Sequence, residues 1–113
     1  LTAKRVYDSQ KNLKLCASLT IQQQHNNAPL LEGALHLDVT FFMKIPMSTS
    51  AKRKELMYGQ PHVFKADLDN LLKFVCDICS NNVIYADDCI IAAITAKKIY
   101  SDKPRTEFTL RQL

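Results

Sequence analysis

Residues 65–88, KADLDNLLKFVCDICSNNVIYADD, combine a helical pattern with two pairs of aspartates. Asp67 and Asp69 stand where the helix should begin, and Asp87 and Asp88 follow the next short apolar run. The pattern predicts an amphipathic helix that packs on a core through one apolar stripe. That stripe consists of Leu71, Leu72, Val75, Cys76 and Cys79. Because like charges repel one another, the two acidic pairs need a physical explanation.

The segments upstream of this helix predict a strand between two shorter helices. Residues 34–45 alternate between apolar and polar side chains, which is typical of a strand with one face on a core. Residues 46–59 predict a short helix that is capped by Ser48 or Ser50 and ended by Gly59. Near the N-terminus, residues 10–24 predict a helix capped by Asp8 or Ser9.

The segments downstream predict mostly strands. Residues 81–88 indicate a turn, a short strand and a second turn, and residues 89–100 are β-branched and apolar enough for a central strand. Residues 106–111 alternate again, and we expect this last strand to form a hairpin with the strand before it. The sum is one α+β domain over residues 1–113, a small mixed or antiparallel sheet with helices packed on it.

Composition favours an ordinary globular protein. The chain has 113 residues, 47% of them hydrophobic, and its formal net charge is +4. No apolar run approaches the roughly 20 residues that span a bilayer. An acidic site within a basic surface would suit a polyanion, although a solvated surface of mixed charge explains the same composition.

The four cysteines include a C-x-x-C pair, Cys76 and Cys79, inside the predicted helix. Such a pair can indicate a redox or zinc site. A redox pair needs an exposed helix N-terminus, and zinc needs two further ligands, for which His62 and Cys89 do not follow a known spacing. Buried, reduced thiols are the favoured interpretation.

Three interpretations compete for the aspartates. Capping and turn formation account for one aspartate at each position but not for two. A calcium loop of the EF-hand type fails, because Leu71, Leu72 and Ile78 stand where it needs a polar ligand, a glycine and a glutamate. A magnesium site is the third interpretation, since Mg²⁺ prefers oxygen ligands and Asp88 could join Asp67 and Asp69 from a different element.

The combination of motifs resembles the RusA family of Holliday junction resolvases. The resemblance rests on KADLDNLLKFVCDICSNNVIYADDCI at residues 65–90, KKIYSDKPRTEF at residues 97–108 and LEGALHLDVTFFMKIP at residues 31–46. These carry the D-x-D-N-x-x-K motif, the aspartate pair before a strand and a P-R-T-E run. The chain departs from the family at Ala66, where a proline is common, and in its first thirty residues.

The resemblance implies a homodimeric, Mg²⁺-dependent endodeoxyribonuclease that cuts four-way DNA junctions symmetrically, in the cytoplasm of a bacterium or on behalf of a phage. The catalytic residues would be Asp67, Asp69, Asp88 and Lys73, and the metal ligands Asp67, Asp69 and Asp88, with Asp87 as a weaker member. Asn70 fits the motif as a cap or a supporting residue. The alternatives are a related nuclease acting on flaps or other branched DNA, and a non-catalytic DNA-binding module. The basic residues expected to contact DNA are Lys52, Arg53, Lys54, Lys65, Lys97, Lys98 and Arg105.

Overall fold

The computed structural model describes residues 2–8, 14–26 and 28–113. Its elements follow one another as β1 (Thr2–Tyr7), α1 (Lys14–His25), β2 (Leu35–Lys44), α2 (Ala51–Met57), α3 (Leu68–Cys79), a short 3₁₀ helix η1 (Asp88–Ile90), β3 (Ile91–Ser101) and β4 (Arg105–Gln112). A mixed sheet with helices confirms the α+β class. None of the helices within the described residues is long and apolar enough to cross a membrane.

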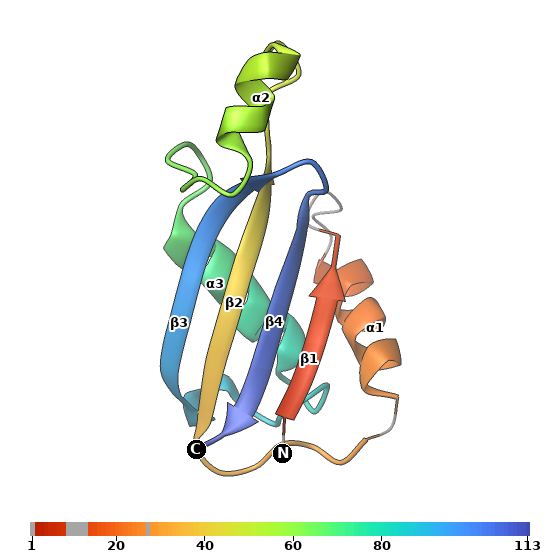
Figure 1. The fold of residues 1–113 in the computed structure, drawn as a ribbon. Coiled ribbons are helices and arrows are strands. Elements are labelled where there is room, and N and C mark those ends of the chain that lie inside the picture. The colour runs from red at the N-terminus through yellow and green to blue at the C-terminus, as the bar shows by residue number, and fades with distance from the viewer. Residues whose placement is uncertain (1, 9–13, 27) are drawn as a thin grey trace.

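The four strands form one sheet in the order β1-β4-β2-β3. Strand β2 pairs in parallel with β3 and antiparallel with β4, and β4 pairs antiparallel with β1. Helices α1 and α3 lie on one face of this sheet, whereas no helix formed by the described residues lies on the opposite face (Figure 1). Helix α2 projects beyond the end of the sheet and has no buried residue (Figure 1).

The core lies between the sheet and helices α1 and α3. The alternation expected for residues 34–45 is confirmed, because Leu35, Leu37, Val39 and Phe41 of β2 are at most 1% exposed. Val75, Ile78 and Cys79 of α3 pack against this face together with Ala17 and Ile21 of α1. The apolar stripe of α3 therefore holds that helix across the sheet and fixes the place of both its ends.

Two expectations about the C-terminal strands were wrong. Strand β3 lies at the edge of the sheet, not at its centre, and β4 does not form a hairpin with it. Residues 102–104 instead carry the chain past the end of β2, so that β4 pairs with the other side of β2. Ala92, Ala93, Ile94 and Thr95 are exposed. This β-branched, apolar strand therefore lies at an edge of the sheet, and much of its first half is exposed to solvent.

The short strand expected within residues 81–88 is also absent. The segment forms turns, with Asn81 and Asn82 at positive φ of 57° and 65°. Ile84 and Tyr85 are nevertheless buried, and the Tyr85 hydroxyl donates a hydrogen bond to the Cys76 carbonyl at 2.9 Å. These apolar side chains fill the core from a loop, which a hydrophobicity pattern cannot distinguish from a buried strand.

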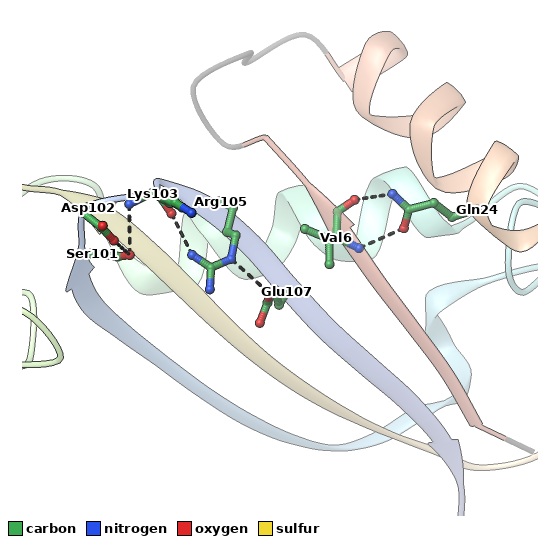
Figure 2. Close-up of polar contacts among 7 residues, drawn as sticks. All are labelled: Val6, Gln24, Ser101, Asp102, Lys103, Arg105 and Glu107. Carbon is green, nitrogen blue, oxygen red and sulfur yellow. Dashed lines mark hydrogen bonds and ion pairs between the residues drawn. The ribbon is translucent and has the colours of Figure 1, made fainter.

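Strand β1 was not expected from the sequence, since residues 2–7 are short and include two basic side chains. It is held by its pairing with β4 and by Gln24 of α1 (Figure 2). The Gln24 side chain donates to the Val6 carbonyl at 2.6 Å and accepts from the Val6 amide at 2.9 Å. Residues 2–7 form a strand because they pair with the distant strand β4. Their local sequence does not reveal this pairing.

The helices were placed correctly. Helix α2 begins after Ser50, whose hydroxyl accepts from the Arg53 amide at 3.3 Å, and the chain turns away at Gly59 with φ of +78°. Asp67 occupies the N-cap position of α3. Helix α1 begins inside the expected segment and ends one residue beyond it. Of its two expected caps, Asp8 is not part of the helix and Ser9 lies outside the described residues.

Candidate active site

Asp67 and Asp69, here called the N-terminal acidic pair, stand at the start of α3, and both are exposed. Asp67 has the extended backbone of an N-cap residue, with φ −71° and ψ 140°, but its side chain makes no capping hydrogen bond. Asp69 lies in the first turn, where a negative charge is favoured by the helix dipole. Capping therefore does not account for the carboxylate of Asp67.

Strand β3 holds the segment that leads into this pair. The ammonium group of Lys98 donates to the carbonyls of Phe64 and Ala66, at 3.0 and 2.9 Å. Lys98 was expected to contact DNA, and that expectation stays a prediction. In the structure its ammonium group fixes the backbone immediately before Asp67, which gives it a positioning role.

Asp77, Asp87 and Asp88, here called the C-terminal acidic group, meet beside the last turns of α3. The Cys89 amide donates to Asp87 at 3.0 Å and lowers the pKa of that carboxyl. The pKa of Asp88 is raised, first because Asp88 shares a hydrogen bond with Asp87, and further by slight burial and by the charges of Asp87 and Asp77. The three carboxylates are therefore close enough to influence one another.

The C-terminal acidic group borders a surface hollow of about 440 Å³. The ammonium group of Lys14, from α1, lies 2.8 Å from the Asp77 carboxylate at its rim. Sequence reasoning did not include Asp77 or Lys14 in the site. Asp77 could have been suspected, because it lies two turns of helix after Asp69, but the contact of Lys14 across 63 residues leaves no local signal.

Helix α3 separates the two acidic clusters. At about 1.5 Å per residue, the eight residues from Asp69 to Asp77 cover about 12 Å along the helix axis, and Asp67 lies further away still. Within residues 2–8, 14–26 and 28–113, no three His, Cys, Asp or Glu side chains are grouped closely enough to hold a metal ion. The oxygen donors suit Mg²⁺ in kind, but one chain does not gather Asp67, Asp69 and Asp88 around one ion.

Lys73 is exposed on α3 between the two clusters. From the sequence, it could have paired with Asp77 one turn later. In the structure Asp77 forms an ion pair with Lys14 instead. In the described part of the chain the Lys73 side chain makes no ion pair or hydrogen bond. Its charge is therefore available to an anion approaching this face of α3.

The expected DNA-binding residues do not share one surface. Lys52, Arg53 and Lys54 belong to the projecting helix α2. Lys97 lies on the helix-free face of the sheet, because its neighbour Ala96 is paired with the buried Val39 and side chains alternate along a strand. Lys65, in the loop before α3, is exposed as well.

Arg105 is held by several contacts within the sheet (Figure 2). Its Nε lies 3.0 Å from the Glu107 carboxylate, its Nη1 donates to the Lys103 carbonyl at 2.9 Å, and its guanidinium carbon lies 3.8 Å from the centre of the Phe42 ring. These contacts orient the guanidinium group and partly neutralise its charge. Arg105 therefore has a structural role in addition to the contact with DNA that the sequence predicts.

The C-x-x-C pair lies on the core side of α3. Cys79 is buried and Cys76 is half-buried, and burial raises the pKa of both thiols. The charges of Asp88 and Asp77 raise the pKa of Cys76 further. Because a reactive cysteine needs a lowered thiol pKa, this environment does not favour redox chemistry.

Two comparisons with known proteins show what this chain is similar to. A Bacillus subtilis (strain 168) protein described as "Uncharacterized protein YqaN" is 29% identical over 97 residues, which cover 82% of this chain and 68% of that protein. The family model described as "Endodeoxyribonuclease RusA" matches residues 2–111, and so includes the first thirty residues, whose resemblance was weak. The chain therefore belongs to the RusA family of endodeoxyribonucleases.

Proposed function

We propose that this protein resolves four-way DNA junctions, acting as a homodimer that cuts two opposed strands in an Mg²⁺-dependent reaction. The observation that carries the proposal is the exposure of the whole motif along one helix and the turn that follows it. Asp67, Asp69, Lys73, Asp87 and Asp88 all reach solvent. In a member of an endodeoxyribonuclease family, exposed carboxylates such as that of Asp67, which makes no capping hydrogen bond, favour chemistry over folding.

The side chains have distinct roles in this proposal. Asp67, Asp69 and Asp88, with Asp87 as a weaker member, would provide oxygen ligands for Mg²⁺, and the two protomers of the dimer would together supply the set that one chain does not gather. When bound, the ion would neutralise negative charge on the scissile phosphate and favour ionisation of water for hydrolysis. The Lys73 ammonium group stabilises negative charge that develops on the phosphate. Basic residues on α2 contact neighbouring phosphates and hold the DNA without reading its sequence.

A two-fold dimer accounts for paired cuts. In a closed dimer each protomer presents the same surface, so two equivalent sites face two symmetry-related strands of a junction. Both a junction and a linear duplex have two strands related by a two-fold axis, but the two cut phosphates are placed differently in each. Dimer symmetry therefore accounts for paired cuts, and the relative position of the two sites would decide which DNA is preferred.

Incubation with three synthetic DNAs tests the proposal. A four-way junction, a flap and a linear duplex of matched sequence are each given protein with Mg²⁺ or with EDTA. We expect symmetric cuts in the junction with Mg²⁺ and no cuts with EDTA. Preferred cutting of the flap would assign the protein to another class of branched-DNA nuclease. Junction binding without cutting of any DNA would identify a non-catalytic binding module.

A further inference from the structure

We propose that a surface hollow beside the end of β3 binds one unstacked base of the DNA strand that passes Asp67. The proposal rests on the nuclease function proposed above and names a feature of its substrate. The hollow, here called the β3 hollow, has a volume of about 200 Å³. Sites for drug-sized ligands have roughly 300–1,000 Å³, so this volume suits a single ring system. The residues that line it include Lys44, His62, Phe64, Lys65 and Tyr100.

Three rings line the β3 hollow. The rings of His62 and Tyr100 pack against each other at 60°, with their centroids 4.9 Å apart. Phe64 contributes the third ring and is 73% exposed. Stacking on an aromatic side chain is favourable for every nucleobase, because each base has a π face. A base stacked on Phe64 would therefore cover an apolar surface that the chain itself leaves in water.

Hydrogen bonds hold the segment that carries His62 and Phe64 beside the end of β3 (Figure 1). The His62 amide donates to the Lys98 carbonyl at 3.0 Å, and the Tyr100 amide donates to the Gln60 carbonyl at 3.0 Å. The Lys98 ammonium group donates to the Phe64 carbonyl at 3.0 Å. The exposed Phe64 side chain therefore belongs to a backbone that is already fixed. This arrangement favours binding, because less freedom is lost when a ligand binds to an ordered site.

The imidazole of His62 has hydrogen-bonding capacity that the fold does not use. His62 is 8% exposed, and its Nδ1 atom is buried without a hydrogen-bond partner among the described residues. Burial, and secondly the charge of Lys98, lower the pKa of His62, so the ring is neutral at pH 7. A neutral imidazole donates from one nitrogen and accepts at the other. The edge of a base, which has donors and acceptors of its own, would offer this ring a partner.

The charges around the β3 hollow suit the rest of a nucleotide. Lys44 and Lys65 are exposed, and no carboxylate is among the described residues that line the hollow. Lys65 lies two residues before Asp67, so a strand with its scissile phosphate at Asp67 would have neighbouring phosphates near these ammonium groups. A nucleotide of the bound strand therefore matches the hollow in both parts, its base at the rings and its phosphate at the lysines.

A site for an unstacked base would favour branched DNA over linear DNA. Moving a base out of a duplex costs stacking and pairing energy, and this cost is smallest for a base that is already unpaired or poorly stacked. In the open form of a junction, the bases next to the crossing point lie at the ends of the arms and have a full stacking neighbour on one side only. The β3 hollow would therefore bind such a base at a lower cost than a base inside a duplex.

Junctions that lack single bases test the proposal. Each junction has one base removed near the crossing point, and binding of wild-type protein and of Phe64→Ala is measured in EDTA. We expect Phe64→Ala to weaken binding of the intact junction about tenfold, as when one base–aromatic stack is lost. On one of the abasic junctions the two proteins should bind equally, because the base that Phe64 contacts is already absent.

Val63→Ala provides the matched control. Val63 is next to Phe64 and is 86% exposed, but it does not line the β3 hollow. This variant should bind every junction as the wild-type protein does. Tyr100→Leu removes a second ring and should lose affinity that depends on the same base. A loss in Phe64→Ala that is equal on the intact and on every abasic junction, or no loss at all, would overturn the base site.

Photochemical cross-linking locates the base independently. Iodouracil at the position found with the abasic junctions should cross-link, on irradiation, to the peptide that contains Phe64 or to the peptide that contains Tyr100. Mass spectrometry identifies these peptides, and cross-links only to other parts of the chain would overturn the base site.

Neither measurement requires cutting, so the two proposals can fail separately. Binding that depends on the base, in a protein that cuts no DNA, would leave the β3 hollow as a base site and overturn the nuclease function. Junction cutting without any dependence on Phe64 would overturn the base site alone. Absence of binding to any branched DNA would overturn both.

Discussion

Asp67 occupies the N-cap of α3, yet its carboxylate makes no hydrogen bond to the first turn of that helix. An aspartate at this position usually stabilises a helix by accepting such a bond, at about 1 kcal/mol. Here the backbone conformation of a cap is present without the side-chain contact. An aspartate at this position is therefore explained better by the binding of a metal ion or substrate than by stabilisation of the helix.

Asp67→Asn should separate chemistry from stability. We expect junction cutting to fall by about a hundredfold or more, as when a group that stabilises transition-state charge is removed. The free energy of unfolding should change by less than about 0.5 kcal/mol, because asparagine and aspartate are similar caps. Cutting assays and urea unfolding measure the two effects. Asp38→Asn, an exposed carboxylate on the helix-free face, is the control and should leave both unchanged.

Lys73→Ala should slow cutting by about tenfold to a hundredfold without affecting the fold, because the lysine provides charge for the phosphate. Within the described residues this side chain makes no ion pair or hydrogen bond that the substitution could remove, since Asp77 pairs with Lys14. Single-turnover cutting and thermal unfolding measure the outcome. Lys73→Arg keeps the charge and should retain more activity than Lys73→Ala. Destabilisation by more than about 1 kcal/mol, large for a surface substitution, would instead indicate a structural role.

At the scale of elements, helices could be located from the sequence and strand partners could not. The stripe of α3 and the Ser50 cap of α2 are local signals, and both helices lie where those signals predicted. Strand β3 has a composition typical of a central strand but lies at the edge, because the loop at residues 102–104 leads β4 past β2. Sheet order depends on contacts between distant residues, for which a single sequence contains little information.

None of the residues of helix α2 is buried in the core. Replacing Lys52, Arg53 and Lys54 together with glutamine should therefore weaken junction binding and leave stability unchanged. The dependence of the logarithm of affinity on the logarithm of salt concentration should become shallower by about 0.9 for each phosphate that the variant no longer neutralises. Glu55→Gln, on the same helix, controls for changes in the helix itself.

Binding measured without Mg²⁺ at several salt concentrations gives this slope, and cutting at saturating protein gives the chemical step. We expect the rate at saturation to be preserved, because none of the three residues belongs to either acidic cluster. An unchanged salt dependence would show that α2 does not contact DNA and would leave its basic residues as an ordinary solvated surface.

At the scale of the whole molecule, the sequence identified candidate acidic residues but not how they are distributed in space. The spacing of Asp67, Asp69 and Lys73 follows from one helix, which local pattern determines. The position of Asp88 depends on residues 80–87, which return along the end of α3 as turns that bury only Ile84 and Tyr85, and not as the expected strand. This path brings Asp88 to Asp77 and leaves the N-terminal acidic pair at the other end of the helix.

The packing of the whole core predicts loss of stability at alkaline pH. Burial raises the pKa of Tyr7 from 10.0 to about 12, and burial also raises the pKa of Cys79 and of Tyr85. Below the ordinary pKa values, both folded and unfolded chains keep these protons, and their contribution to stability is complete. At higher pH the unfolded chain ionises first. Unfolding then becomes easier as pH rises towards the folded-state values.

For Tyr7 alone, this linkage removes roughly 1 kcal/mol of stability by pH 11. Urea unfolding between pH 8 and pH 11, followed by circular dichroism, should therefore show a falling midpoint. Tyr7→Phe has no proton to lose at this position, so its midpoint should fall less steeply, with the remaining slope due to Cys79 and Tyr85. Phenolate absorbance should show the Tyr7 hydroxyl ionising together with unfolding. Equal slopes for both proteins would mean that the Tyr7 hydroxyl reaches water in the folded state, contrary to its 6% exposure.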